Sequence, residues 1–196
     1  MTAPRFAESQ RALILHRAHP TVDAIVRQLT QIGMTADQHW PELPSGLEPG
    51  RHAVLFFDAD MGHDEQFPWP AGASPMPTIA LIGSEAPGRV AWAIRRGADA
   101  HLLKPVAGGG IYSAVLIARE AFARRQGLQQ ELAAIKTRLE KRELLAEATA
   151  FLMLSEDLTA RQAFQQLRLR AMAQRLTIEI VAERILEQTK RRHDRA

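Results

Sequence analysis

The sequence predicts an α/β domain with a mostly parallel sheet, followed by a long helix and an all-α bundle of three helices. Three observations support this fold class. Short apolar runs alternate with amphipathic segments up to about residue 107, as in βα units. Between residues 111 and 154 there is no proline and one glycine, Gly127, which is typical of a long helix. Two further helix starts follow in the last 40 residues.

Five strands are expected in the amino-terminal part. Four short apolar runs predict buried strands, and a fifth, weaker strand is expected near residues 34–38. The four runs are ALIL at 12–15, AVLFF at 53–57, TIALI at 78–82 and AHLL at 100–103.

Helices are expected between these strands at residues 22–33 and 89–98, where apolar residues recur at helical spacing and a glycine provides a stop signal. Residues 41–50 and 62–77 are rich in proline and glycine. We therefore expect loops there, and any helix within them must be short.

The long helix carries an apolar stripe with the alternating spacing of four and three that defines a coiled-coil seam. The stripe consists of Leu128, Leu132, Ile135 and Leu139. It predicts a homodimer, and packing against the chain's own domain is the alternative. We expect a domain at residues 1–110, a helical coiled-coil linker at 111–138 and a three-helix bundle at 139–196.

Two threonines mark the later helix starts. Thr159 and Gln162 form a capping box, and Thr177 offers its hydroxyl to a helix that runs through Ile180, Val181 and Ile185. Together with the end of the long helix, these two helices make the expected bundle.

Charge is distributed unevenly along the chain. Residues 1–110 hold 9 Lys/Arg against 11 Asp/Glu, whereas residues 111–196 hold 16 against 11, so a net charge of −2 is followed by one of +5. The basic half suggests a polyanionic partner such as nucleic acid, the alternative being ordinary solvated helix faces. There is no cysteine and no apolar run of membrane-spanning length, so we expect a soluble cytoplasmic protein.

Two segments of the amino-terminal half resemble the response-regulator receiver family, whose domains are flavodoxin-like. The segment DADMG at 58–62 follows an apolar strand, and GADAHLLKPV at 97–106 resembles the end of the family's fifth strand. The resemblance implies that Asp58 stands at the phosphoacceptor position. It also implies that Lys104 matches the family's invariant lysine and Pro105 its cis-proline.

The residues that receiver chemistry also needs are missing. His16 and Arg17 follow the first strand where an acidic pair would hold Mg²⁺, and the hydroxyl at the end of strand four is absent unless Ser84 replaces it. We therefore expect a pseudo-receiver that binds proteins. The adjacent polar residues 63–65 do not predict a metal site, and no catalytic or phosphate-loop motif is present, so we expect neither an enzyme nor a cofactor.

Residues from about 139 to 186 resemble the ANTAR domain, the RNA-binding module of antitermination regulators of amidase and nitrate-assimilation operons. The matching segments are RELLAEATAFLM at 142–153, LTARQAFQQLRLRAM at 158–172 and RLTIEIVAERIL at 175–186. A degenerate receiver before an ANTAR domain resembles the amidase-operon branch in particular. That resemblance implies control by a ligand-sensing negative regulator protein instead of phosphorylation.

The second bundle helix predicts an RNA-binding face. On a helical wheel Ala160, Ala163, Phe164, Leu167 and Ala171 form one apolar stripe. A neighbouring flank carries Arg161, Gln165, Arg168, Met172 and Arg175, and Lys141 and Arg142 on the incoming helix extend it. Guanidinium groups pair with phosphate and stack on bases, so this flank is our candidate for RNA contact. A solvated helix face is the alternative.

The sequence therefore predicts a transcription antiterminator that binds leader mRNA hairpins as a dimer and prevents terminator formation. The alternative is a phosphorylation-dependent response regulator whose helical output binds DNA or protein, with an interaction scaffold as a third reading.

Overall fold

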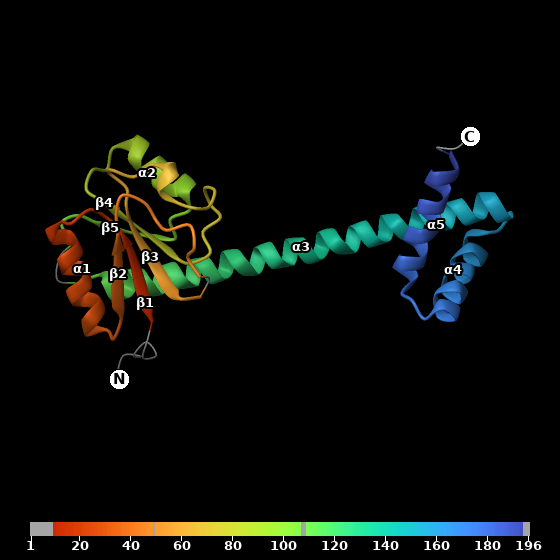
Figure 1. The fold of residues 1–196 in the computed structure, drawn as a ribbon, viewed down its shortest axis with the longest axis horizontal. Helices are drawn as coiled ribbons and strands as arrows, with labels where there is room; N and C mark the ends of the chain where they lie inside the picture. The colour runs from red at the N-terminus through yellow and green to blue at the C-terminus, as the bar shows by residue number, and fades with distance from the viewer. Residues whose placement is uncertain (1–9, 49, 107–108, 194–196) are drawn as a thin grey trace. The chain divides into compact units, whose positions relative to one another are not determined.

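The computed structural model describes residues 10–48, 50–106 and 109–193, with side chains up to residue 187. The chain divides into two compact units, residues 1–127 and 128–196, which are described separately (Figure 1). In the described part of the chain no helix has the length and apolar character needed to cross a membrane.

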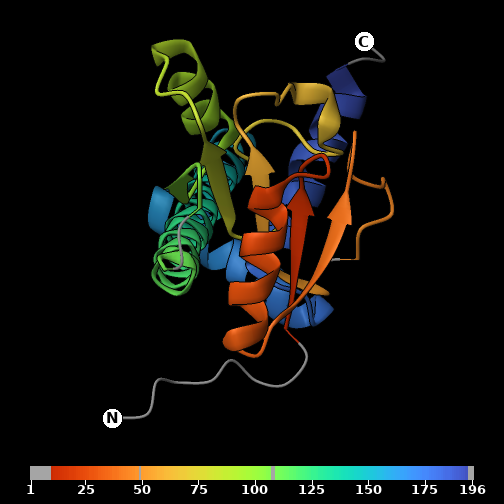
Figure 2. The same cartoon turned by 90° about the vertical axis from the view of Figure 1, so that its left-hand side faces the viewer.

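The first unit contains a five-stranded parallel sheet in the order β2-β1-β3-β4-β5. All five expected strands are confirmed, the weak second strand included. Their bounds are β1 Arg11–Leu15, β2 Thr35–His39, β3 His52–Asp58, β4 Thr78–Ile82 and β5 Ala100–Leu103. Because every strand is parallel, all carboxyl ends meet at one edge of the sheet, visible in Figure 2.

Both helices of this unit end at the predicted glycine stop signals, Gly33 and Gly97, and begin two residues earlier than expected. Helix α1 (Pro20–Gln31) starts with a proline in its first turn, and α2 (Pro87–Arg96) ends at Gly97, whose φ of 91° is in the left-handed region. The loop between β3 and β4 contains only a short 3₁₀ turn, η1 (Asp64–Gln66). Arg96 anchors this loop, because it donates to the Trp69 carbonyl at 2.6 Å and lies 4.0 Å above the Phe67 ring.

The sheet is covered on both faces, which explains why its central strands are apolar throughout. Helix α1 and the first turns of α3 (Ile111–Glu156) cover one face, and α2 with the two long loops covers the other. Val22, Ile25 and Leu29 pack on the first face with Ile111 and Val115. This layered α/β arrangement confirms the receiver-like fold class.

The second unit is a three-helix bundle made by the end of α3, α4 (Ala160–Gln174) and α5 (Ile178–His193). The capping box at Thr159 is present, and the Ile180 amide donates to the Thr177 hydroxyl at 3.4 Å. The fully buried residues are mostly small: Ala148, Leu152, Ala163, Leu167, Ala171, Val181 and Ala182. Small side chains let the helices approach closely.

One part of the predicted apolar stripe on α4 is wrong. Ala163, Leu167 and Ala171 are buried, but Ala160 is exposed and the Phe164 side chain is 42% exposed. The reason is steric, because three closely packed helices have room for alanine on α4 and not for a phenyl ring at the adjoining position. Phe164 therefore lies at the edge of the core.

Candidate functional site

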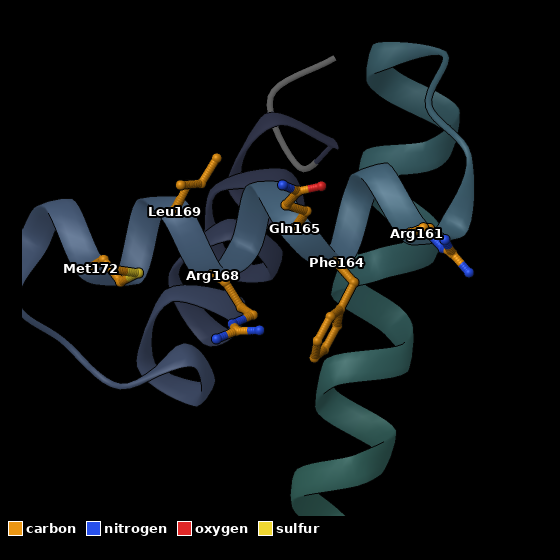
Figure 3. Close-up of a pocket in the computed structure, with 6 residues that line it drawn as sticks. All are labelled: Arg161, Phe164, Gln165, Arg168, Leu169 and Met172. Carbon is orange, nitrogen blue, oxygen red and sulfur yellow. The ribbon is translucent and has the colours of Figure 1, made fainter.

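An exposed face of α4 combines cationic, amide and apolar side chains. They recur at helical spacing along the whole helix and line two adjoining surface hollows of about 380 and 460 Å³. We call this set the α4 face: Arg161, Phe164, Gln165, Arg168, Leu169, Met172 and Arg175 (Figure 3). The structure thus brings together Arg161, Gln165, Arg168 and Arg175, all four predicted on this helix.

The arginines of the α4 face are not paired with acidic side chains among the described residues. Within the described residues, Arg161, Arg168 and Arg175 form no ion pair, whereas Arg170 of the same helix is held by Glu156 at 2.6 Å. Arg175 lies at the helix C-cap with a φ of 55°, directly before the turn into α5. Guanidinium groups that are not paired within the protein attract anions, so this face is the candidate site for an anionic ligand.

The two residues predicted to extend this face lie on the incoming helix, outside the hollows. Lys141 and Arg142 are exposed on α3, and neither lines the hollows of the α4 face. Lys141 lies near Glu179 of α5 instead. The pKa of Glu179 is lowered chiefly by hydrogen bonds to its own backbone amide and to the Thr177 hydroxyl, with a smaller contribution from the charge of Lys141.

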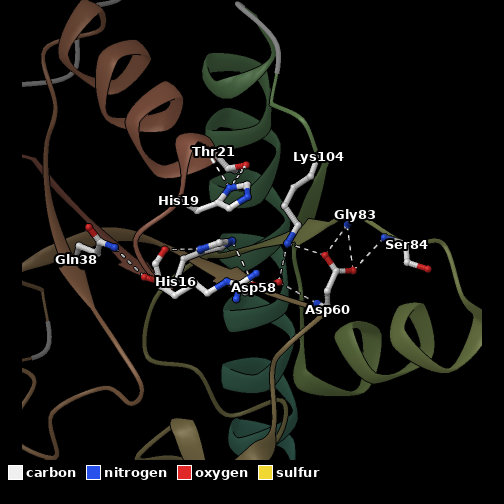
Figure 4. Close-up of polar contacts among 10 residues, drawn as sticks. His16, His19, Thr21, Gln38, Asp58, Asp60, Gly83, Ser84 and Lys104 are labelled. Carbon is white, nitrogen blue, oxygen red and sulfur yellow. Dashed lines mark hydrogen bonds and ion pairs between the residues drawn. The ribbon is translucent and has the colours of Figure 1, made fainter.

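A second polar cluster lies at the carboxyl edge of the sheet in the first unit (Figure 4). Asp58 ends β3 and its side chain is only 2% exposed. Lys104 reaches it from the end of β5, with Nζ 2.8 Å from Asp58 Oδ1 and 2.6 Å from Asp60 Oδ2. The Lys104–Pro105 bond is cis, as the receiver resemblance implies.

His16 contacts the other oxygen of Asp58. Strand register places Leu15 opposite Phe57, so the residues that follow in each strand are neighbours. His16 Nδ1 lies 2.7 Å from the Arg17 carbonyl oxygen, and Nε2 lies 3.2 Å from Asp58 Oδ2 in the geometry of an ion pair. Nδ1 donates to the Arg17 carbonyl, whereas Nε2 faces Asp58 Oδ2 without a hydrogen-bond partner among the described residues. His16 thus stands at the position where the receiver resemblance implies an acidic metal ligand.

Asp60 occupies the place expected for the hydroxyl of strand four. Its carboxylate accepts from the amides of Gly83 and Ser84 at 2.8 and 3.0 Å. The Ser84 hydroxyl instead accepts from the Ala86 amide, so it does not replace the missing group. Burial alone would raise the pKa of Asp60, but hydrogen bonds from Lys104 and the two amides outweigh it and lower that pKa below its ordinary value.

Both oxygens of Asp58 have neighbours inside this cluster. Oδ1 accepts from Lys104 Nζ and from the Asp60 amide, and Oδ2 lies 3.2 Å from His16 Nε2. No group of three potential metal ligands occurs in the part of the chain that the structure describes. The side chains of residues 63–65 do not converge on one point. His63 contacts Glu65 at 3.1 Å in solvent, whereas Asp64 accepts a hydrogen bond from the Trp92 indole.

Sequence comparison identifies both halves of the chain. The family described as AmiR, N-terminal, matches residues 10–119, more than half of the protein. The chain belongs to the AmiR family. The ANTAR domain matches residues 133–186, which includes the whole α4 face. Together the two domains place this AmiR-family chain among the transcription antitermination regulators.

Two characterised relatives are similar to it. The Aliphatic amidase regulator of Pseudomonas aeruginosa is 25% identical over 177 residues, covering 90% of each chain. The Transcriptional regulatory protein PdtaR of Mycobacterium tuberculosis is 34% identical over 91 residues, which is 46% of this chain and only 44% of PdtaR. Among solved structures, full-length FixJ from B. japonicum aligns over 91% of this chain and 98% of its own, with 15% identity and a TM-score of 0.46.

Sequence reasoning missed two residues of these sites in the AmiR-family chain. His16 was treated only as a missing carboxylate. Its position directly after a buried strand, level with Asp58, was the signal that the two side chains could meet. Phe164 was assigned to the apolar stripe, and no local pattern distinguishes an edge position from a core position on the same helix.

Proposed function

We propose that this chain is a transcription antiterminator that binds hairpins in leader mRNA through the α4 face. The observation that supports it best is the row of unpaired arginines beside exposed apolar side chains, inside the segment that matches the ANTAR domain. Phosphate pairing and contact with splayed loop bases need these two kinds of group side by side. Binding one RNA fold in preference to another requires no covalent step.

The functional form in this proposal is a homodimer, with a pseudo-receiver at 1–110, a linker at 111–138 and the RNA-binding bundle at 139–196. The coiled-coil stripe supports this arrangement. Leu128, Leu132, Ile135 and Leu139 are each 47–66% exposed in the single chain. A second copy of α3 would cover them at coiled-coil spacing.

Control in this proposal comes from a partner protein, in place of phosphorylation. A receiver aspartate needs a free oxygen and a metal that offsets the incoming charge. Here Lys104 pairs with Asp58 at 2.8 Å, His16 stands where a metal ligand is expected, and the Asp58 side chain is only 2% exposed. A ligand-sensing negative regulator that docks on the receiver-like unit or on the dimer is the input that fits these features.

RNA binding is tested with hairpins from the leader of the chain's own operon, in gel shifts across a salt series. Arg168→Ala and Arg175→Asn should each weaken binding and reduce the salt slope by about 1, because each removes one phosphate contact. Asparagine is chosen at 175 because it tolerates positive φ. Arg124→Ala, an equal charge change at an exposed arginine of the first unit, is the control. Preference for duplex DNA of equal length would contradict the proposal.

Phosphorylation is tested separately by incubation with acetyl phosphate and Mg²⁺, followed by intact-mass measurement. The wild-type protein should show no adduct. A stable adduct that disappears in Asp58→Asn would favour the alternative of a phosphorylation-dependent regulator.

A further inference from the structure

Phe164 is placed unusually for a phenylalanine in a small helical bundle. The residue is 42% exposed, although Ala163 and Leu167 of the same helix are fully buried in the core of the bundle. A partly exposed aromatic ring presents a flat apolar face to solvent. That is the geometry of a surface to which a flat ligand can bind.

The surroundings of Phe164 define the chemistry of that ligand. Arg161 and Arg168 flank it, one turn to either side, and Figure 3 shows the Phe164 ring and the Arg168 side chain extending to the same side of α4. Phe164 also lines both hollows of the α4 face, so it stands at the point where they adjoin.

We propose that Phe164 is the stacking platform for one unpaired base in the loop of the bound RNA hairpin. This inference rests on the proposed function and adds the residue that selects a loop over a duplex. Phosphates on either side of an extruded base would meet Arg161 and Arg168, while the base covers the ring. Bases inside a duplex are stacked already and present no face to the ring.

The charges favour RNA over a partner helix as the occupant of this hollow. An apolar groove for an amphipathic helix is typically apolar along its length, with anchors spaced over two turns. Here free arginines border the exposed ring, and the described residues place no carboxylate along the lining of the first hollow. A polyanion with an exposed aromatic face matches both features.

The proposal is tested with the leader hairpin in which one loop base at a time is replaced by 2-aminopurine or by an abasic site. Wild-type protein should quench 2-aminopurine at one loop position, as stacking on an aromatic ring does. Phe164→Leu should lose that quenching and bind roughly 10- to 100-fold more weakly, with an unchanged salt slope. Phe164→Tyr should retain both, and Leu154→Ala, an exposed apolar change elsewhere in the unit, should have no effect.

The decisive comparison combines the protein and RNA changes. Removing the stacked base should weaken wild-type binding about as much as Phe164→Leu does, and it should cost the Phe164→Leu protein almost nothing further. Equal binding of Phe164→Leu and wild type to every hairpin would overturn the stacking role while leaving RNA binding intact. Failure of the wild-type protein to bind the hairpin would overturn the proposed function itself, and the stacking role with it.

Discussion

Replacing His16 by leucine tests whether the buried contact between His16 and Asp58 stabilises the receiver-like unit. Leucine fills a similar volume, but it leaves Asp58 Oδ2 without the ion pair at 3.2 Å and the Arg17 carbonyl without its donor. Breaking a buried ion pair costs about 3–5 kcal/mol when it leaves a charge with no partner. Asp58 keeps Lys104 at 2.8 Å, so its charge is not left alone.

We therefore expect a loss of about 2–3 kcal/mol in the free energy of unfolding, below the full range for an unpaired buried charge. For a unit of this size that corresponds to a decrease in Tm of roughly 8–15 °C. Tryptophan fluorescence is the assay, because Trp40, Trp69 and Trp92 all lie in the first unit and report on it alone.

A double-mutant cycle with Asp58→Asn separates the ion pair from other effects of the substitution. Without the carboxylate, His16→Leu should be less destabilising by about 1 kcal/mol or more. His101→Gln, at an exposed histidine of β5, is the control and should change stability by less than about 0.5 kcal/mol. Additive effects of His16→Leu and Asp58→Asn within about 0.5 kcal/mol would refute a stabilising contact between these two side chains.

Three further predictions follow from the same structure. Because the pKa of Asp60 is lowered in the folded protein, its carboxylate stabilises the fold at pH values above its ordinary pKa of 3.8, and this stabilisation is lost as the pH falls below that value. Asp60→Asn should therefore flatten the pH dependence of the free energy of unfolding between about pH 5 and 3. A Cβ at Gly83 would lie 2.7 Å from Asp60 Oδ2, so Gly83→Ala should displace that carboxylate and cost about 1–3 kcal/mol by fluorescence-monitored denaturation. Leu132→Lys, in the centre of the proposed seam, should give monomers in sedimentation equilibrium; an unchanged mass would exclude the seam.

Local sequence patterns were sufficient to predict the elements of both units. Strands such as TIALI at 78–82 have a run of apolar residues that only a sheet covered on both faces can bury, and β4 has those same bounds. The Thr159 capping box and the stop at Gly97 depend on residues within one turn, so they were also readable. The combination of Asp58, Lys104 and the ANTAR-like segments indicated the family because these are short contiguous motifs.

The tertiary structure decided what the side chains of these elements meet. His16 and Asp58 are distant in sequence and become neighbours only through the parallel register of β1 and β3. Phe164 and Leu167 share one side of the same helical wheel, and the approach of α3 and α5 determines that Leu167 is buried while Phe164 stays at the edge. Periodicity fixes the direction of a side chain relative to its own element, whereas its burial and its charge partners depend on other elements that pack against it.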